Sequence, residues 1–161
     1  MGSVVQRCER DRWRWWDTVA AMTYAADFGL MRQIAGNPLL TCVKPRAQWT
    51  AIPTGYTFDA DYDVFVNSSG VTWKPVSSTS LNAADYATVP FLPSSGNADQ
   101  QLVLAGVVDQ GSRFGRILPA DIATVQAAQW LEIDGYTYDL TEATPMPAGA
   151  ALWYAVRLSK R

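Results

Sequence analysis

The stretch WLEIDGYTYDL, from Trp130 to Leu140, decides the fold class of this chain. Apolar and polar side chains alternate on both sides of Asp134-Gly135, which is the pattern of two half-buried strands. Asp-Gly between such runs is a strong hairpin signal, because both central residues of the turn need a positive φ. The run Leu152 to Leu158 alternates in the same way after a Pro/Gly-rich connection. It is predicted to pair as the next strand, so this part of the sequence predicts an antiparallel meander.

Between residue 39 and the meander, short runs rich in β-branched and aromatic residues alternate with turn sequences such as Asn67-Ser68-Ser69-Gly70. Many short strands at close spacing are typical of all-β domains. We therefore predict a mainly β fold, a small β-barrel or sandwich, over residues 39–161. The further predicted strands are Gln48–Ile52, Tyr62–Val66, Val71–Val76, Tyr86–Phe91, Leu102–Val108 and Phe114–Leu118.

Residues 1–38 form a separate N-terminal segment, in which a helix is predicted from about residue 9 to residue 36. Gly36-Asn37-Pro38 supplies its stop, because glycine accepts the left-handed conformation at a helix end and proline cannot continue the helix. Two apolar series at helical spacing make this helix apolar over more than one face. The first series is Trp13, Trp16, Ala20, Tyr24, Phe28, Met31 and Ile34, and the second is Trp15, Val19, Met22, Ala26 and Leu30.

The amino-acid composition excludes most kinds of catalytic site. The chain of 161 residues contains no His and only two Cys, so a Ser–His–Asp triad cannot form and no metal motif is present. The spacing of Asp59, Asp61 and Asp63 resembles the start of a calcium loop, but Val64 and Gly70 occupy the positions that need glycine and a carboxylate. We expect no enzymatic activity and no cofactor. An enzyme that uses carboxylates alone, such as Glu132 with Glu142, is the weakest alternative.

The formal net charge is −2, and no run of basic residues marks a nucleic-acid-binding face. No segment reaches the roughly 18 consecutive apolar residues that span a bilayer. The sequence MGSVVQRCERDRWRWW carries charge where a signal peptide would be apolar. We therefore expect a protein made in the cytoplasm without a membrane partner, in which Cys8 and Cys42 stay reduced.

The aromatic surplus, with seven Trp and seven Tyr, permits a second hypothesis. Carbohydrate-binding modules are often β-sandwiches that stack sugars on exposed aromatic rings. Against this hypothesis, three tryptophans lie on the predicted helix and the other four, Trp49, Trp73, Trp130 and Trp153, lie in predicted strands, where burial is the default.

The segment from Gly115-Arg116-Ile117-Leu118 to Arg161 resembles head-closure or head–tail connector (stopper) proteins of long-tailed bacteriophages. The resemblance rests on an apolar strand, the turn at Asp134-Gly135, the aromatic strand that follows it, and a closing strand bearing Leu152-Trp153. It covers about 45 of the 161 residues. Typical members are shorter and lack the Trp-rich N-terminal segment, a departure that also suits an adaptor, a tail-completion protein or another minor virion protein.

The resemblance implies a small β-barrel without enzymatic activity or cofactor, several copies of which form a ring in the phage neck. The implied partners are other copies of the chain, the portal or adaptor proteins, tail proteins, and genomic DNA that passes without sequence-specific binding. In such a ring, one stripe of the helix would pack on its own barrel and the other on the next subunit. The alternative is a helix that is buried wholly within one subunit. The candidate subunit-interface residues are Trp13, Trp15, Trp16, Met22 and Leu30.

A polar loop supplies the candidate channel or tail-docking residues, which are Ser94, Ser95, Gly96, Asn97 and Asp99; an ordinary surface loop is the favoured alternative. Between Ala47 and Ser112 the only basic residue is Lys74, against Asp59, Asp61, Asp63, Asp85, Asp99 and Asp109. Because few phosphate neutralisations mean weak non-specific binding, acidic walls would let DNA slide through a channel.

Overall fold

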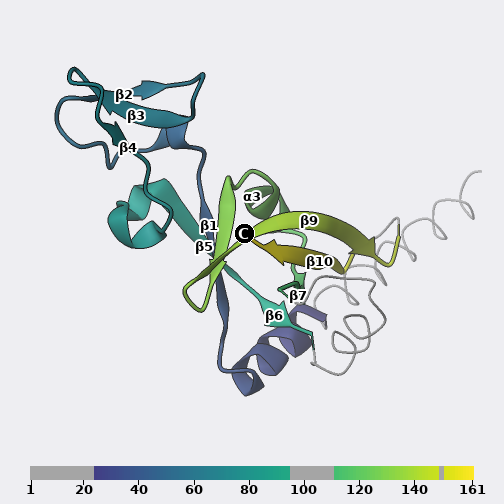
Figure 1. The fold of residues 1–161 in the computed structure, drawn as a ribbon. Coiled ribbons are helices and arrows are strands. Elements are labelled where there is room, and N and C mark those ends of the chain that lie inside the picture. The colour runs from purple at the N-terminus through teal and green to yellow at the C-terminus, as the bar shows by residue number, and fades with distance from the viewer. Residues whose placement is uncertain (1–23, 95–110, 149–150) are drawn as a thin grey trace, which may run out of the picture.

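A computed structural model describes residues 24–94, 111–148 and 151–161 of the chain, and the statements below concern these residues. Ten strands form two antiparallel sheets, one with the order β5-β1-β8-β9-β10-β7-β6 and one with the order β2-β3-β4 (Figure 1). The prediction of a mainly β fold is confirmed. The strands are β1 (Leu39–Val43), β2 (Tyr56–Asp59), β3 (Val64–Asn67), β4 (Thr72–Trp73), β5 (Tyr86–Pro90), β6 (Leu92–Pro93), β7 (Arg113–Ile117), β8 (Trp130–Ile133), β9 (Tyr136–Met146) and β10 (Trp153–Lys160).

Helical structure is limited to short segments within the described ranges. The predicted N-terminal helix is present over residues 24–34, and its predicted residues 9–23 lie outside the described part. A one-and-a-half-turn helix, α3 (Ile122–Gln126), precedes β8. Three 3₁₀ turns lie beside the smaller sheet: η1 (Arg46–Gln48), η2 (Ser78–Ser80) and η3 (Ala83–Asp85).

The meander forms as its sequence predicts. Asp134 and Gly135 have φ values of 51° and 79°, and they join β8 to β9 with Ile133 opposite Tyr136. The positive φ values are those that a two-residue hairpin turn requires. Strand β10 then pairs with β9 from Trp153 to Lys160, which confirms the predicted third strand.

The seven-stranded sheet curls until its two end strands nearly meet. Strands β5 and β6 stand at opposite ends of the sheet, yet only Phe91 separates them in the chain. They do not pair with each other, so the sheet is sandwich-like and not a hydrogen-bonded closed barrel. Phe91 packs directly on Gly115 of β7, where an added Cβ would lie 2.3 Å from the Phe91 ring and 2.8 Å from the Leu92 carbonyl oxygen.

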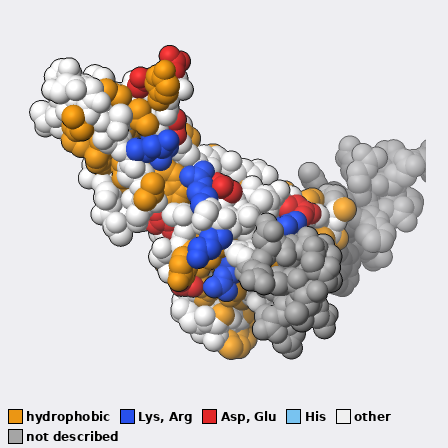
Figure 2. Space-filling view, in the orientation of Figure 1, with side chains coloured by type: hydrophobic (Ala, Val, Ile, Leu, Met, Phe, Trp, Pro, Cys, Tyr) orange, Lys and Arg blue, Asp and Glu red, His pale blue; other side chains and the backbone are white. Residues whose placement is uncertain are grey.

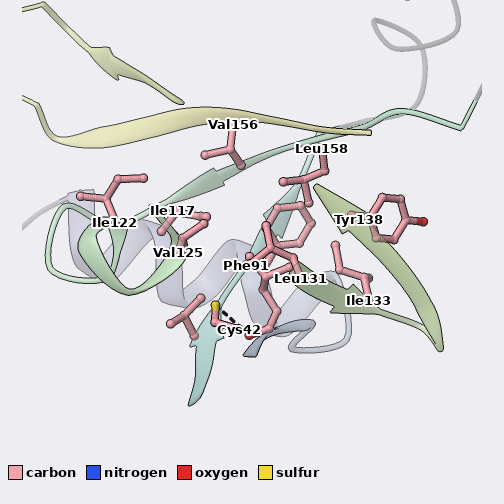
Figure 3. Close-up of a cluster of buried hydrophobic side chains, with 12 residues drawn as sticks. Cys42, Phe91, Ile117, Ile122, Val125, Leu131, Ile133, Tyr138, Val156 and Leu158 are labelled. Atoms are coloured by element: carbon pink, nitrogen blue, oxygen red, sulfur yellow. Dashed lines mark hydrogen bonds between the residues drawn. The ribbon is translucent and has the colours of Figure 1, made fainter. Parts of the chain in front are cut away.

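A hydrophobic core fills the concave side of this sheet (Figure 3). Its members come from seven elements and include Leu40, Phe91, Ile117, Val125, Leu131 and Leu158. Cys42 is a free thiol within this core, and burial raises its pKa to about 12. Cys8 lies outside the described residues.

Some predicted strands are wrong, and each error has a local cause. Residues Gln48–Ile52 contain no strand, because η1 and the bonds from Thr50 and Ala51 to Asp85 hold this segment. The predicted strand at Val71–Val76 shrinks to Thr72–Trp73, and the one at Leu102–Val108 lies outside the described part.

Strands β1 and β2 and helix α3 were not predicted. Strand β1 lies between β5 and β8, and its sequence LLTCV is nearly continuous in apolar residues.

The smaller sheet projects from the main body as a lobe, which we define as residues 56–73. Figure 1 shows the lobe and the helix of residues 24–34 at opposite ends of the described structure. The described part of the chain is therefore elongated and offers two separate ends for contacts.

Candidate interaction surfaces

The helix of residues 24–34 ends in a regular stop signal. The Asn37 amide donates to the Arg32 carbonyl (2.7 Å) and the Gly36 amide to the Gln33 carbonyl (3.2 Å), with Gly36 at φ 83°. This is the Schellman arrangement, in which a residue of positive φ lets the last carbonyls find donors. The predicted helix stop at Gly36 is confirmed.

One side of this helix is fixed to the body. Phe28 is 1% exposed, and the Tyr24 ring stacks on Trp153 with 6.3 Å between ring centroids. The Arg116 guanidinium lies over the same Trp153 ring at 4.5 Å. Burial raises the pKa of Tyr24, although the nearby positive charge of Arg116 opposes the shift. These contacts hold the helix against the body through Tyr24 and Phe28, which belong to the first of the two predicted apolar series.

The other side of the helix has no partner among the described residues. Ala26, Leu30 and Ile34 follow one another at steps of four, so they form one row, and Leu30 and Ile34 are 59% and 81% exposed. Ile34 belongs to the first predicted series together with Tyr24 and Phe28, but its side chain is exposed, because the helix ends there and the chain turns away. We call these three residues the apolar row. Of the candidate interface residues, Leu30 lies in it; Trp13, Trp15, Trp16 and Met22 lie outside the described part.

The candidate docking loop is described only at its first residue. Ser94 is half-buried, and its amide donates to the Phe114 carbonyl at 2.9 Å, which extends the pairing of β6 with β7. Ser95, Gly96, Asn97 and Asp99 lie outside the described residues.

The lobe is joined to the body by an aromatic cluster. Trp49 contacts Phe65 and Trp73 of the lobe and Trp130 of β8, with ring centroids 5.8, 6.1 and 5.6 Å apart. The Arg46 side chain, 3% exposed, lies against this cluster with its guanidinium 5.4 Å from the Trp49 ring and 5.1 Å from the Trp130 ring. Such cation–π contacts gain strength when water is excluded.

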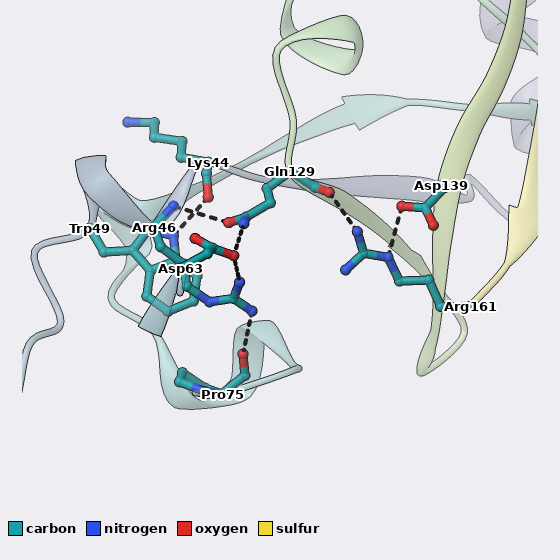
Figure 4. Close-up of polar contacts among 8 residues, drawn as sticks. All are labelled: Lys44, Arg46, Trp49, Asp63, Pro75, Gln129, Asp139 and Arg161. Atoms are coloured by element: carbon teal, nitrogen blue, oxygen red, sulfur yellow. Dashed lines mark hydrogen bonds and ion pairs between the residues drawn. The ribbon is translucent and has the colours of Figure 1, made fainter. Parts of the chain in front are cut away.

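A polar network fixes the same junction (Figure 4). Arg46 forms an ion pair with Asp63 and donates to the Pro75 carbonyl at 3.3 Å. Gln129 donates to Asp63 at 2.8 Å and accepts from the Arg46 amide at 3.0 Å. Asp63 therefore anchors the lobe and is not an open ligand for a cation.

Two further carboxylates bind backbone at the junction. Asp85 is fully buried and accepts from the Thr50 hydroxyl (2.8 Å) and from the amides of Thr50, Ala51 and Asn82. Burial alone would raise the pKa of Asp85, but these hydrogen bonds favour the carboxylate and bring the pKa below its ordinary value. Glu132 accepts from the Ser78 amide (2.7 Å), the Ser78 hydroxyl and the Trp130 indole (2.9 Å).

Replacing Asp85 with Asn tests how far this junction supports the fold. One Asp85 oxygen accepts from the amide and hydroxyl of Thr50, and the other accepts from the amides of Ala51 and Asn82. Asparagine replaces one of these oxygens with an N–H donor, so one pair of donors loses its acceptor, and we expect Asp85→Asn to lower the free energy of unfolding by about 3 kcal/mol at pH 7. Because the folded pKa is lowered, the wild-type advantage is complete above the ordinary pKa of 3.8 and declines as pH falls through the lower folded value. Urea unfolding at pH 7 and at successively lower pH measures the loss of unfolding free energy in Asp85→Asn and its decline with falling pH. An equal loss of unfolding free energy at every pH would contradict the account.

The suggested catalytic carboxylates do not form a pair. Glu132 lies opposite Thr137 and Glu142 lies on β9 five positions further along, which separates them by roughly 15 Å at the rise of a strand. Glycosidase carboxylates lie within about 10 Å of each other. Within the described ranges, no group of three or more Cys, Asp or Glu side chains is placed to hold a metal ion.

The four described tryptophans are engaged in packing. Trp49 and Trp130 are 4% and 2% exposed, Trp73 packs on Trp49 and Phe65, and Trp153 contacts Tyr24 and Arg116. Burial of Trp49 and Trp130 follows the prediction, although Trp49 lies after η1 and not in a strand. Rings held in this way do not favour sugar stacking.

Comparison of the chain with family models, with curated proteins and with solved structures finds no match in any of the three. Over the described ranges, no helix has both the length and the apolar character needed to cross a membrane.

Proposed function

We propose that the protein is a structural component of a bacteriophage neck. In this proposal, copies of the chain form a ring between the portal or adaptor and the tail, close the DNA-filled head and join the tail to it. The protein is made in the host cytoplasm and acts in the virion, without catalysis or a cofactor.

The observation that carries the proposal is the apolar row on the helix. A subunit of a ring needs two different surfaces, because head-to-tail contacts are heterologous. Leu30 and Ile34 are exposed by 59% and 81% at one end of an elongated chain, and the lobe stands at the other end. Exposed apolar side chains gathered in one row are typical of interaction surfaces.

The distribution of charge supports the passage of DNA. Asp59 and Asp61 of the lobe form no ion pair within the described residues, and Lys74 is the only cation between β1 and β7 apart from Lys44 and Arg46. A channel lined by such a lobe would neutralise few phosphates and would bind DNA weakly.

Labelling of virions tests the proposed location. Antibodies against the purified chain, bound to particles and viewed by electron microscopy with gold, are expected to mark the junction of head and tail. Label confined to tail fibres or to the head surface, or absence of the chain from purified particles, would contradict the proposal.

A further inference from the structure

A cleft lies between α3 and the end of the seven-stranded sheet where β1 pairs with β5. It has a volume of about 160 Å³, and most of its lining side chains are small and apolar. Cys42 and Ala87, which lie opposite each other on β1 and β5, contribute to it from the sheet, and Thr124 and Ala127 contribute from α3 and its C-terminal end. These short side chains leave room between the helix and the sheet, and we call this space the α3 cleft.

A positive charge stands at the α3 cleft. Lys44 lines the cleft and is exposed, and its ammonium donates to the Ala84 carbonyl at 2.7 Å, which fixes its position. Lys44 forms no ion pair with any described residue, and a carbonyl oxygen does not neutralise its charge. Asp121 lies at the other end of α3, at its N-cap, and does not line the cleft. The α3 cleft therefore combines an apolar lining with one cation and favours an apolar group beside an anion.

The lobe carries an exposed aromatic side chain next to an exposed carboxylate. The turn between β2 and β3, residues 59–63, contains three aspartates and Tyr62, and we call it the acidic turn. Asp63 is held in the junction network, whereas Asp61 is exposed and Tyr62 is 75% exposed. The Asp59 carboxylate accepts from the Asp61 amide at 3.0 Å, which shapes the turn. Figure 2 shows acidic and hydrophobic side chains together at an outer corner of the lobe.

The acidic turn and the α3 cleft match in size and in charge. A space of about 150 Å³ holds a benzene-sized ring, so the α3 cleft is large enough for the ring of Tyr62. Because Asp61 is the preceding residue in the chain, its carboxylate comes within reach of Lys44 when the ring enters. Tyrosines that are exposed in the free chain and buried by a partner are frequent anchors of an interface.

Building on the proposed ring, we propose that the acidic turn of one copy docks into the α3 cleft of the next copy, with the Tyr62 ring in the cleft and Asp61 beside Lys44. The turn and the cleft are different surfaces of one chain, which is what a head-to-tail contact needs. The junction around Arg46 and Trp49 holds the lobe against β8, so each copy presents both surfaces at the same time. The opposite charges set the partner and the register.

Filling the cleft tests the contact in the full-length chain. Thr124 is an exposed residue of α3 that lines the cleft, so Thr124→Trp is expected to occupy the space for Tyr62 and to weaken self-association about tenfold or more in analytical ultracentrifugation. Tyr62→Ala is expected to weaken it to the same degree. Gln126→Trp is the matched control, because Gln126 is exposed on the same helix and does not line the cleft, and it is expected to associate like the wild type.

A charge exchange tests the pairing of the two surfaces. Asp61→Lys and Lys44→Glu each place like charges together, and each is expected to weaken self-association about tenfold. The double variant Asp61→Lys with Lys44→Glu restores an opposite-charge pair and is expected to return to within about threefold of the wild type. Circular dichroism and urea unfolding verify that each variant keeps the fold.

The outcomes separate this contact from the ring itself. If the wild type stays monomeric at all concentrations, both the ring and the contact are overturned. If the wild type associates and Thr124→Trp and Tyr62→Ala associate equally well, the contact is overturned and the ring stands. If Thr124→Trp leaves self-association unchanged but yields heads without tails, the α3 cleft serves a different protein and the proposal is overturned. Rescue in the charge-exchanged double variant supports it.

Discussion

Gly115→Ala is expected to lower the free energy of unfolding by about 3 kcal/mol or more. The added Cβ would lie 2.3 Å from the Phe91 ring and 2.8 Å from the Leu92 carbonyl, so both a core ring and a backbone would have to move. Phe91 is the residue that links the two end strands of the curled sheet. The substitution therefore strains the point where the sheet nearly closes, and urea unfolding measures the loss.

Gly29→Ala is the matched control. Among the described residues, no atom beyond the adjacent residues and the helix's own backbone lies within 4 Å of a Cβ placed there, and Gly29 lies within the helix of residues 24–34. Alanine favours a helix over glycine, so this variant is expected to gain up to about 1 kcal/mol. A Gly115→Ala protein as stable as the wild type would show that Phe91 does not pack as described.

Leu30→Asp combined with Ile34→Asp is expected to abolish assembly while the fold is kept. Both side chains are mostly exposed in the single chain, so charge at these positions costs the monomer little. If the apolar row is covered by the next subunit, loss of two apolar contacts and burial of charge weaken association about 100-fold or more. Light scattering of the purified chain and its incorporation into particles measure the effect.

Phe28→Asp serves as the comparison on the opposite side of the helix. Phe28 is 1% exposed, so this variant is expected to destabilise the fold itself. Normal association and normal particles from the Leu30 and Ile34 double variant would remove the apolar row from any interface.

The sequence predicts the locally determined parts of this fold. The Asp134-Gly135 hairpin and the stop at Gly36 depend on a few adjacent residues whose φ values only certain residue types accept. Strands β3 and β4 of the lobe were predicted in part, but their separation into a second sheet was not, because it depends on distant contacts such as those of Arg46 with Trp130 and Asp63. Strand β1 was missed because its sequence LLTCV is nearly continuous in apolar residues and does not alternate, although Leu39 is exposed while Leu40 and Cys42 are buried.

In the interaction surfaces too, local sequence patterns predict some residues, and contacts between distant parts of the chain determine the others. Helical periodicity identifies Leu30 as part of a second apolar series, and the structure places its side chain in the open. The buried roles of Arg46 and Asp85 were also missed, since charged residues are mostly exposed and the partners of these two are distant in the chain.

Electron microscopy of a lysate from the parent phage lacking this gene tests the proposed neck function most directly. The account predicts separate tails beside unjoined heads, many of the heads emptied of DNA, with joined particles restored when the intact gene is supplied. Normal joined particles without the gene would contradict it.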